Sequence, residues 1–249
     1  MSDVRVIPSR AFAARVIPDV AGTETAAALA ERQQRARTTG WGALCVADPL
    51  ADVCTERGLV RGHQYQITGD ASLSLMYALV ARATAEGSWL AMVNVSRAGL
   101  AAAKENGVAM HRVLGVTVPS HASSAVWAST VGALVDGIDL VVVSDMCCSA
   151  NDARRIAARV RAAGSVLLVL GDCGACVPDG KFGASTVRWN FDAHAHSRVV
   201  RIRHATRRVH AVRECSVLLP GPSGRIESMS EPLRDHGASV CDATSEWAQ

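Results

Sequence analysis

Short apolar segments alternate with helical segments between residues 65 and 170, and this alternation restricts the fold more than any other feature of the sequence. The apolar segments are nearly continuous runs of Val, Leu, Ile and Ala, which is typical of strands buried on both faces. They lie at residues 89–95, 113–118, 138–144 and 165–170, and a more polar strand, Tyr65-Gln66-Ile67-Thr68, precedes them. The first helical segment begins at Ser72, and the others occupy residues 98–105, 123–135 and 150–163. We therefore predict an α/β fold with a mainly parallel sheet flanked by helices.

The pattern changes after residue 180, where polar and apolar side chains alternate along successive segments. These segments are residues 185–189, 198–203 and 209–218. Strands with this alternation are typical of antiparallel sheets, so we expect antiparallel additions on the C-terminal side of the sheet. The last residues contain Gly221-Pro222-Ser223-Gly224 and more acids than arginines, which indicates a flexible acidic tail over residues 218–249.

Residues 1–40 are predicted to form an N-terminal arm and a helix outside a core of residues 41–217. The arm contains a near-duplicate, Val4-Arg5-Val6-Ile7-Pro8 and Ala14-Arg15-Val16-Ile17-Pro18. Each copy is β-branched and stops at proline, which restricts it to a sheet edge. Two interpretations remain open: a partly ordered arm, or a strand that adds to the sheet of a partner. In the second case the contacts would come from Val6, Ile7, Phe12, Val16 and Ile17.

Residues 65–79 have the order of a phosphate-binding loop, namely a strand, a tight turn at Gly69-Asp70 and a helix. A functional loop of this class needs the pattern G-x-x-x-x-G-K-[S/T]. With the first glycine at Gly69, the second glycine, the lysine and the magnesium-binding hydroxyl fall on Ser74, Leu75 and Met76. The scaffold is therefore present without the side chains that bind phosphate.

Composition favours a soluble cytoplasmic protein. The chain of 249 residues is 49% apolar, enough to bury a large core. It has no apolar run of the roughly 18 residues that a membrane helix needs, and its first residues lack the apolar core of a signal peptide. The eight cysteines are accordingly expected to be reduced. The only lysines are Lys104 and Lys181; the stretch before Lys181 imitates a phosphate-binding loop, but its spacing is one residue too long and Phe182 follows.

The order of these motifs resembles the core of the RecA recombinases over roughly residues 41–217. The segments that carry the resemblance are Gly58-Leu59-Val60-Arg61-Gly62, residues 65–79, Val93-Asn94-Val95-Ser96 and residues 137–145. Within that superfamily the chain most resembles the ImuA-prime family, the RecA-like accessory proteins of the actinobacterial mutasome. The resemblance implies a protein with a RecA-like core. It also implies that the protein is induced by DNA damage and works in translesion synthesis.

Three positions that carry ATPase chemistry in this superfamily hold other residues here. The phosphate-binding lysine falls on Leu75, the glutamate that activates water on Ser96, and the Walker B aspartate on Ser144. Asp145 is displaced by one residue, which points a strand side chain to the other face unless a bulge returns it. Loss of the lysine removes a charge-assisted contact worth about 1.5–3 kcal/mol, and Asp70 adds a repelling charge. We predict no catalytic residue, no cofactor and no ATP hydrolysis.

Arginines are dense between residues 188 and 213, where Asp192 is the only acid. The candidate contacts to DNA or to an acidic partner are Arg198, Arg201, Arg203, Arg207 and Arg208. The alternative is that these charges protect exposed strand edges against pairing with other sheets. Trp189 and Phe191 are the only aromatic residues nearby that could stack on bases.

Two further clusters could carry chemistry. Cys173-Gly174-Ala175-Cys176 has the spacing of a redox-active pair or of half a zinc site, but the chain has no second such pair. His194, His196, His204 and His210 lie near one another in sequence. A structural zinc site needs four convergent ligands, so we expect incidental thiols, solvated histidines and no metal.

The main functional hypothesis is a non-catalytic RecA-like adaptor in DNA-damage tolerance. The resemblance implies a Y-family polymerase homologue of the ImuB type as the partner, with an error-prone replicative-type polymerase reached indirectly. It also implies association with the nucleoid and the replisome after damage. The alternative is a single-stranded-DNA-binding protein that modulates recombinase filaments or the SOS response. A thiol- or metal-dependent enzyme is a third hypothesis.

Overall fold

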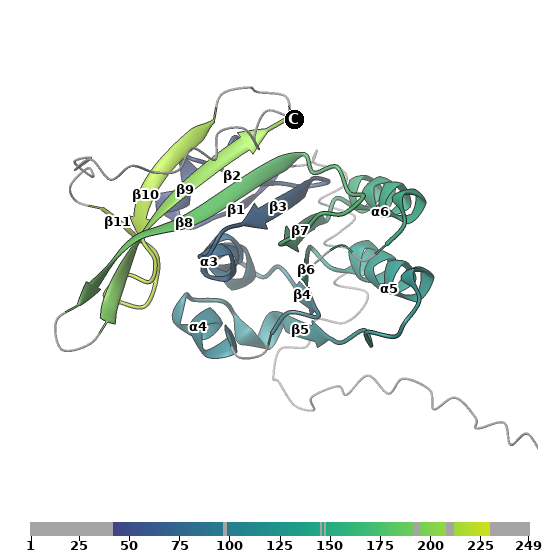
Figure 1. Ribbon diagram of the computed structural model, residues 1–249, viewed down its shortest axis with the longest axis horizontal. Helices are drawn as coiled ribbons and strands as arrows, with labels where there is room; N and C mark the ends of the chain where they lie inside the picture. Colours follow the sequence, from purple (N-terminus) through teal and green to yellow (C-terminus); the bar gives the residue numbers. More distant parts are fainter. Residues whose placement is uncertain are drawn as a thin grey trace, which may run out of the picture.

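The domain is built on one large mixed sheet. The computed structural model describes residues 42–96, 99–144, 146, 148–191, 195–207 and 212–229. Within these residues, nine strands are ordered β11-β10-β9-β8-β3-β7-β6-β4-β5 (Figure 1). The expected α/β fold is confirmed: a mainly parallel sheet flanked by helices, with antiparallel strands at the C-terminal side. The predicted arm over residues 1–40, with Val6, Ile7, Phe12, Val16 and Ile17, lies outside the described residues.

The parallel part of the sheet places the strand of the degenerate loop in the interior. Its strands are β3 (Gln64–Thr68), β4 (Leu90–Val93), β5 (Val113–Val116), β6 (Leu140–Ser144) and β7 (Val166–Leu170). β3 pairs in parallel with β7 on one side and with the start of β8 on the other. Both edges of β3 are thus hydrogen-bonded, and Gln64, Tyr65 and Ile67 of this strand are buried.

The antiparallel part begins with β8, which first pairs with β3 and then continues beyond it. Its strands are β8 (Gly180–Phe191), β9 (Ala195–Thr206), β10 (Arg213–Leu218) and β11 (Glu227–Ser228). The last residue of β3, Thr68, pairs with Gly183, so the rest of β8 extends past the carboxyl end of β3. A bulge between Thr186 and Arg188 interrupts the pairing with β9. The β8–β9 hairpin therefore projects from the sheet, at the lower left of Figure 1.

The helices cover the two faces of the parallel strands in pairs. Helix α3 (Ser72–Ala85) and α4 (Leu100–Glu105) lie on one face, and α5 (Ser124–Gly137) and α6 (Ala150–Ala163) lie on the other (Figure 1). A short 3₁₀ turn, Met110–Arg112, precedes β5. Helix α6 begins and ends as the sequence predicted, because Ser149 caps its first turn and Gly164 adopts φ +65° after its last.

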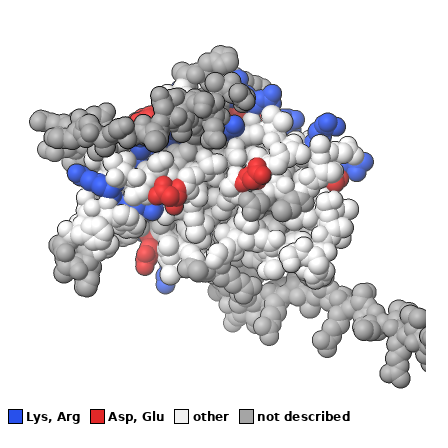
Figure 2. Space-filling view, in the orientation of Figure 1, with Lys and Arg blue, Asp and Glu red and all other residues white. Residues whose placement is uncertain are grey.

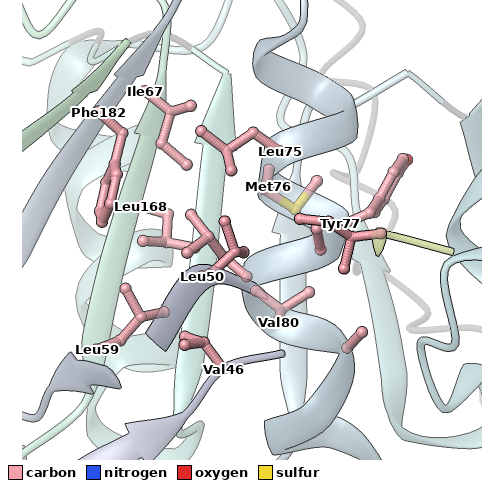
Figure 3. Packing of buried hydrophobic residues seen from close by; sticks show 14 of the residues in the cluster. Val46, Leu50, Leu59, Ile67, Leu75, Met76, Tyr77, Val80, Leu168 and Phe182 are labelled. Carbon is pink, nitrogen blue, oxygen red and sulfur yellow. The ribbon is translucent and has the colours of Figure 1, made fainter. Parts of the chain in front are cut away.

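Alternate residues of each central strand enter two separate hydrophobic clusters. On β6, Leu140 and Val142 pack on the α3 side, whereas Val141 and Val143 pack on the α5–α6 side. This is the period of two that strands impose on their side chains. Figure 3 shows the α3-side cluster. It contains Leu75 and Met76 of α3 together with Ile67, Leu168, Val46 and Leu50.

Two segments differ from the prediction. Residues 58–62, which begin and end with glycine, are predicted from the sequence to be a loop, but β2 (Gly58–Val60) pairs with β1 (Ala43–Cys45), and α2 (Asp48–Ala51) joins the two. A Cβ atom at Gly58 would lie 2.4 Å from the Leu44 carbonyl oxygen, so the glycine permits close pairing rather than a turn.

The folded domain also continues past residue 217. Leu219 and Ile226 belong to the α3-side cluster, and β11 pairs with β10. The first part of the segment predicted to be a flexible tail from residue 218 is therefore folded, because buried apolar residues lie among its glycines and prolines. Among the described residues, no helix is long and apolar enough to cross a membrane.

Candidate functional site

The turn between β3 and α3 is shorter than a phosphate-binding loop. Strand β3 ends at Thr68 and α3 begins at Ser72, so only three residues, 69–71, join them. The Ser72 amide donates to the Gly69 carbonyl at 3.2 Å, which closes the turn on itself. A loop that cradles phosphate instead directs several backbone amides toward the anion. The helix therefore starts before a cradle can form.

Gly69 holds this turn tightly against β8. Its φ is +100°, and a Cβ atom there would lie 2.1 Å from the Ala184 carbonyl oxygen. The same carbonyl accepts a hydrogen bond from the Ala71 amide at 3.2 Å. The glycine is consequently required for packing of the turn on the neighbouring strand.

We expect Gly69→Ala to lower the free energy of unfolding by at least about 2 kcal/mol, because it adds backbone strain and a clash. Gly62→Ala is the matched control: Gly62 also has positive φ, +79°, but its nearest neighbouring atom is 3.5 Å from the Cβ position. The control should cost only the conformational part, about 1 kcal/mol. Urea denaturation followed by circular dichroism measures both, and equal losses would contradict the packing role.

The positions of the phosphate-binding lysine and the magnesium-binding hydroxyl are occupied by core residues. Leu75 and Met76 are both 0% exposed. Figure 3 shows them on the first turns of α3, directed into the hydrophobic cluster with Ile67. A longer polar side chain at either position would have to leave that cluster to reach the turn.

Asp70 stands where the anion would approach. Its Oδ1 accepts a hydrogen bond of 3.0 Å from the Thr186 amide on β8. Burial alone would raise the pKa of Asp70, but the hydrogen bonding from Thr186 outweighs it, and the pKa lies below the ordinary value of 3.8. Asp70 is therefore a carboxylate at neutral pH, and it repels a second anion.

Ser74, at the position of the second glycine, is bound by an arginine from the hairpin. The Arg198 Nη2 donates to the Ser74 Oγ at 2.9 Å, and its Nε donates to the Leu219 carbonyl at 2.8 Å. The guanidinium lies 5.0 Å from the centre of the Trp189 ring, and the residue is 8% exposed. Burial lowers the pKa of Arg198, and the nearby Asp70 opposes this. Arg198, one of the predicted arginine contacts, is thus buried and binds Ser74, one of the residues of the predicted nucleotide site.

The other two ATPase positions lie along the same carboxyl edge of the sheet. Ser144 ends β6, and its Oγ donates to the Asn94 carbonyl oxygen at 3.0 Å. Asn94, with φ +55°, also accepts from the Val118 amide at 2.8 Å through its side chain. Ser96 is exposed two residues further along the chain, and Asp145 lies outside the described residues. These contacts join the ends of β4, β5 and β6.

The remaining arginines do not form one group with Arg198. Arg201 and Arg203 both lie near Glu214 of β10, at 3.3 and 3.4 Å from its carboxylate oxygens. Arg207 is exposed, and Arg208 lies outside the described residues. On the face shown in Figure 2, blue atoms lie at the left and at the upper right, and red acidic side chains and uncharged surface lie between them.

Two aromatic rings are exposed on the projecting hairpin. Trp189 is 45% and Phe191 is 67% exposed, and their ring centres are 6.4 Å apart. A second register shift lies between Asn190 and Phe191, so it is the ring contact, and not the strand alternation, that places the two side chains together. The sequence showed these residues, but only the hairpin geometry shows that they are exposed together.

The third group of sequence candidates does not assemble into one site. Cys173 and Cys176 lie in the loop after β7, on the α5–α6 side. His204 is buried on β9, stacked on Phe182 with ring centres 4.1 Å apart, and His196 is exposed at the start of β9. Among the described residues, no three His, Cys, Asp or Glu side chains lie together in a way that could hold a metal.

Comparison with known proteins gives one family likeness. The model of a family described as the MT3502 N-terminal domain matches residues 52–175, from the end of α2 to the loop after β7. The match covers just under half of the chain and includes the β3–α3 turn, Leu75, Ser96 and Ser144. No curated protein matches the sequence. In this comparison the chain is similar to the MT3502 N-terminal domain over the helix-covered half of its sheet.

Proposed function

We propose that the protein is a non-catalytic adaptor with a RecA-like core that acts in DNA-damage-induced translesion synthesis. The proposal joins the resemblance of the motif order to the ImuA-prime family with the geometry of the β3–α3 turn. Its partner would be a Y-family polymerase homologue of the ImuB type, through which an error-prone replicative-type polymerase is reached.

The observation that carries the proposal is the replacement of phosphate contacts by contacts within the protein. Where the loop would bind an anion, Asp70 binds the Thr186 amide and Ser74 binds Arg198. The position of the lysine is buried. An arrangement of this kind supports a domain that retains its scaffold for binding partners and does not use nucleotide.

The hairpin offers an interaction surface that fits this role. Val187, Trp189 and Phe191 are exposed by 40%, 45% and 67%. Aromatic side chains with a neighbouring arginine dominate the binding energy of many protein interfaces. Because Arg198 already fixes the Trp189 ring, little side-chain freedom is lost when a partner covers it.

An affinity pull-down from DNA-damaged cells, with and without nuclease, tests the adaptor role. We expect the ImuB-type protein to be retained after nuclease treatment. With purified partners, the double variant Trp189→Ala/Phe191→Ala should weaken binding by about 2 kcal/mol, roughly thirtyfold in dissociation constant. Val126→Ala on α5, which removes a side chain that is also exposed (48%), is the control and should not change it. Loss of the partner on nuclease treatment would contradict the proposal.

The second candidate function is binding of single-stranded DNA, and the same hairpin favours it. Exposed aromatic rings stack on bases, with each stack worth about 1–3 kcal/mol. Against it, Arg201 and Arg203 lie beside Glu214, and the basic side chains visible in Figure 2 do not form a continuous stripe. DNA binding predicts an affinity that falls steeply with salt and weakens when Arg201, Arg203, Arg207 and Arg208 become glutamate.

A further inference from the structure

The loop between β7 and β8 lies directly against β3. At one end, the Gly171 amide donates to the Ile67 carbonyl at 3.0 Å, and the Gln66 side chain donates to the Gly171 carbonyl at 2.9 Å. At the other end, the Asp179 amide donates to the Gln64 carbonyl at 2.8 Å. The loop is thus held along the whole length of β3, and a change in the loop acts on the strand that leads to the Gly69 turn.

Two cysteines of this loop, Cys173 and Cys176, lie together on its buried side. The Cys176 amide donates to the Cys173 carbonyl at 2.9 Å, which closes a tight turn over Gly174. The two residues are only 6% and 8% exposed, whereas Gly174 and Ala175 between them are exposed. The Cys176 thiol lies 3.0 Å from the Gln64 Oε1 and donates its one proton to it, and the Cys173 thiol lies within hydrogen-bonding reach of the Cys176 sulfur. The two thiols are therefore buried, and exposed residues of the same loop lie beside them.

The two thiols have unequal acidity. The hydrogen-bonding contact with Cys176 lowers the pKa of Cys173 more than burial and the nearby Asp172 raise it, and Lys181 makes a smaller lowering contribution. The same hydrogen bond and burial raise the pKa of Cys176. Because the thiolate is the reactive form of cysteine, Cys173 is the attacking group of the pair and Cys176 the resolving group.

We propose that Cys173 and Cys176 form a reversible intramolecular disulfide, with a small disulfide of the glutathione type as the oxidant. The Cys173 thiolate attacks one sulfur of the small disulfide and releases one thiolate, which leaves a mixed disulfide on Cys173. Cys176 then loses its proton, attacks the Cys173 sulfur and releases the second small thiolate. Two protein thiols are oxidised, and one small disulfide is reduced to two thiols.

Oxidation has a consequence at β3. A disulfide sulfur carries no proton, so Cys176 can no longer donate to Gln64, whose side chain is buried with the residue 1% exposed. A buried acceptor without its donor destabilises the structure around it. The bond should therefore form only in oxidising conditions, as labile regulatory disulfides do, and the oxidised protein should melt at a lower temperature.

The full-length protein, equilibrated in mixtures of reduced and oxidised glutathione, provides the test. Acid quenching, alkylation of the remaining thiols after denaturation, and tryptic digestion place both cysteines in one peptide, between Arg161 and Lys181. We expect this peptide to lose two hydrogens in a single transition as oxidised glutathione increases, and to recover them with a dithiol reductant. The melting temperature should fall over the same transition.

Variants separate the roles of the three residues. Cys176→Ser should accumulate glutathione on Cys173, and Cys173→Ser should do so more slowly on Cys176. Gln64→Leu removes the buried acceptor, so the disulfide should form at a roughly tenfold lower ratio of oxidised to reduced glutathione. The wild-type protein carries the test even where a variant fails to fold. If the peptide stays fully alkylated at every ratio while the exposed Cys45 takes up glutathione, the proposal is wrong.

Discussion

Leu75→Lys, the change that restores the missing lysine of the phosphate-binding loop, is expected to lower the free energy of unfolding at pH 7 by about 4–5 kcal/mol. Leu75 is 0% exposed among apolar side chains of the α3-side cluster. A lysine there must either lose its proton or carry a charge into that cluster. Deprotonation at pH 7 alone costs about 1.4 kcal/mol for each pH unit below its ordinary pKa of about 10.4.

The pH dependence gives this prediction a distinct signature. The folded state would lower the pKa of the new lysine, so the unfolded state binds more protons between the two pKa values. Stability is then lost at low pH and recovers as pH rises toward the unfolded pKa. Between pH 7 and 9 the difference between Leu75→Lys and Leu75→Met should shrink by about 2.7 kcal/mol.

Chemical denaturation at both pH values measures this difference, and Leu75→Met is the control because it preserves volume and costs less than about 1.5 kcal/mol. Calorimetry with ATP is the second measurement, and we expect no binding by either variant. A folded Leu75→Lys protein that binds ATP at micromolar concentration would contradict the view that the turn is closed to phosphate.

The parallel half of the fold could be predicted because its strands are continuous apolar runs. Strands β6 and β7 are buried on both faces, so Leu140–Val143 and Val166–Val169 leave little choice of structure. The pairing of β1 with β2 could not, since a three-residue strand that begins at Gly58 has the composition of a loop. Its structure depends on a partner strand thirteen or more residues away.

The sequence names candidate residues but not their arrangement. The loop pattern places the missing lysine at Leu75, and the resemblance to the RecA superfamily places the missing acids at Ser96 and Ser144. The role of Arg198 cannot be predicted from the sequence, because an arginine among other arginines suggests a charged surface. Its burial depends on contacts with Ser74 and Leu219, which are 124 and 21 residues away in sequence.

Arg198→Met is expected to lower the free energy of unfolding by about 2–4 kcal/mol. Methionine keeps most of the apolar stem but removes the donors to the Leu219 carbonyl and the Ser74 hydroxyl. Each buried acceptor left without a donor costs about 1–3 kcal/mol. Arg154→Met on the exposed surface of α6 is the matched control and should change stability by less than about 0.5 kcal/mol.

A double-mutant cycle with Ser74→Ala isolates the contact between Arg198 and the second-glycine position of the degenerate loop pattern. If Arg198 and Ser74 stabilise each other, the loss in Arg198→Met/Ser74→Ala should be smaller than the sum of the single losses by about 1 kcal/mol. Arg198→Lys is informative because it keeps the charge but cannot donate to both acceptors in one plane, so it should recover only part of the loss. Additive losses would mean that the arginine acts through Leu219 and Trp189 alone, and the hydrogen bond between Asp70 and Thr186 would then join the turn to the hairpin without a contribution from Arg198. A coupling of the expected size would instead show that α3 and the hairpin stabilise each other, so that a partner bound to Trp189 and Phe191 would act on a residue of the degenerate loop pattern.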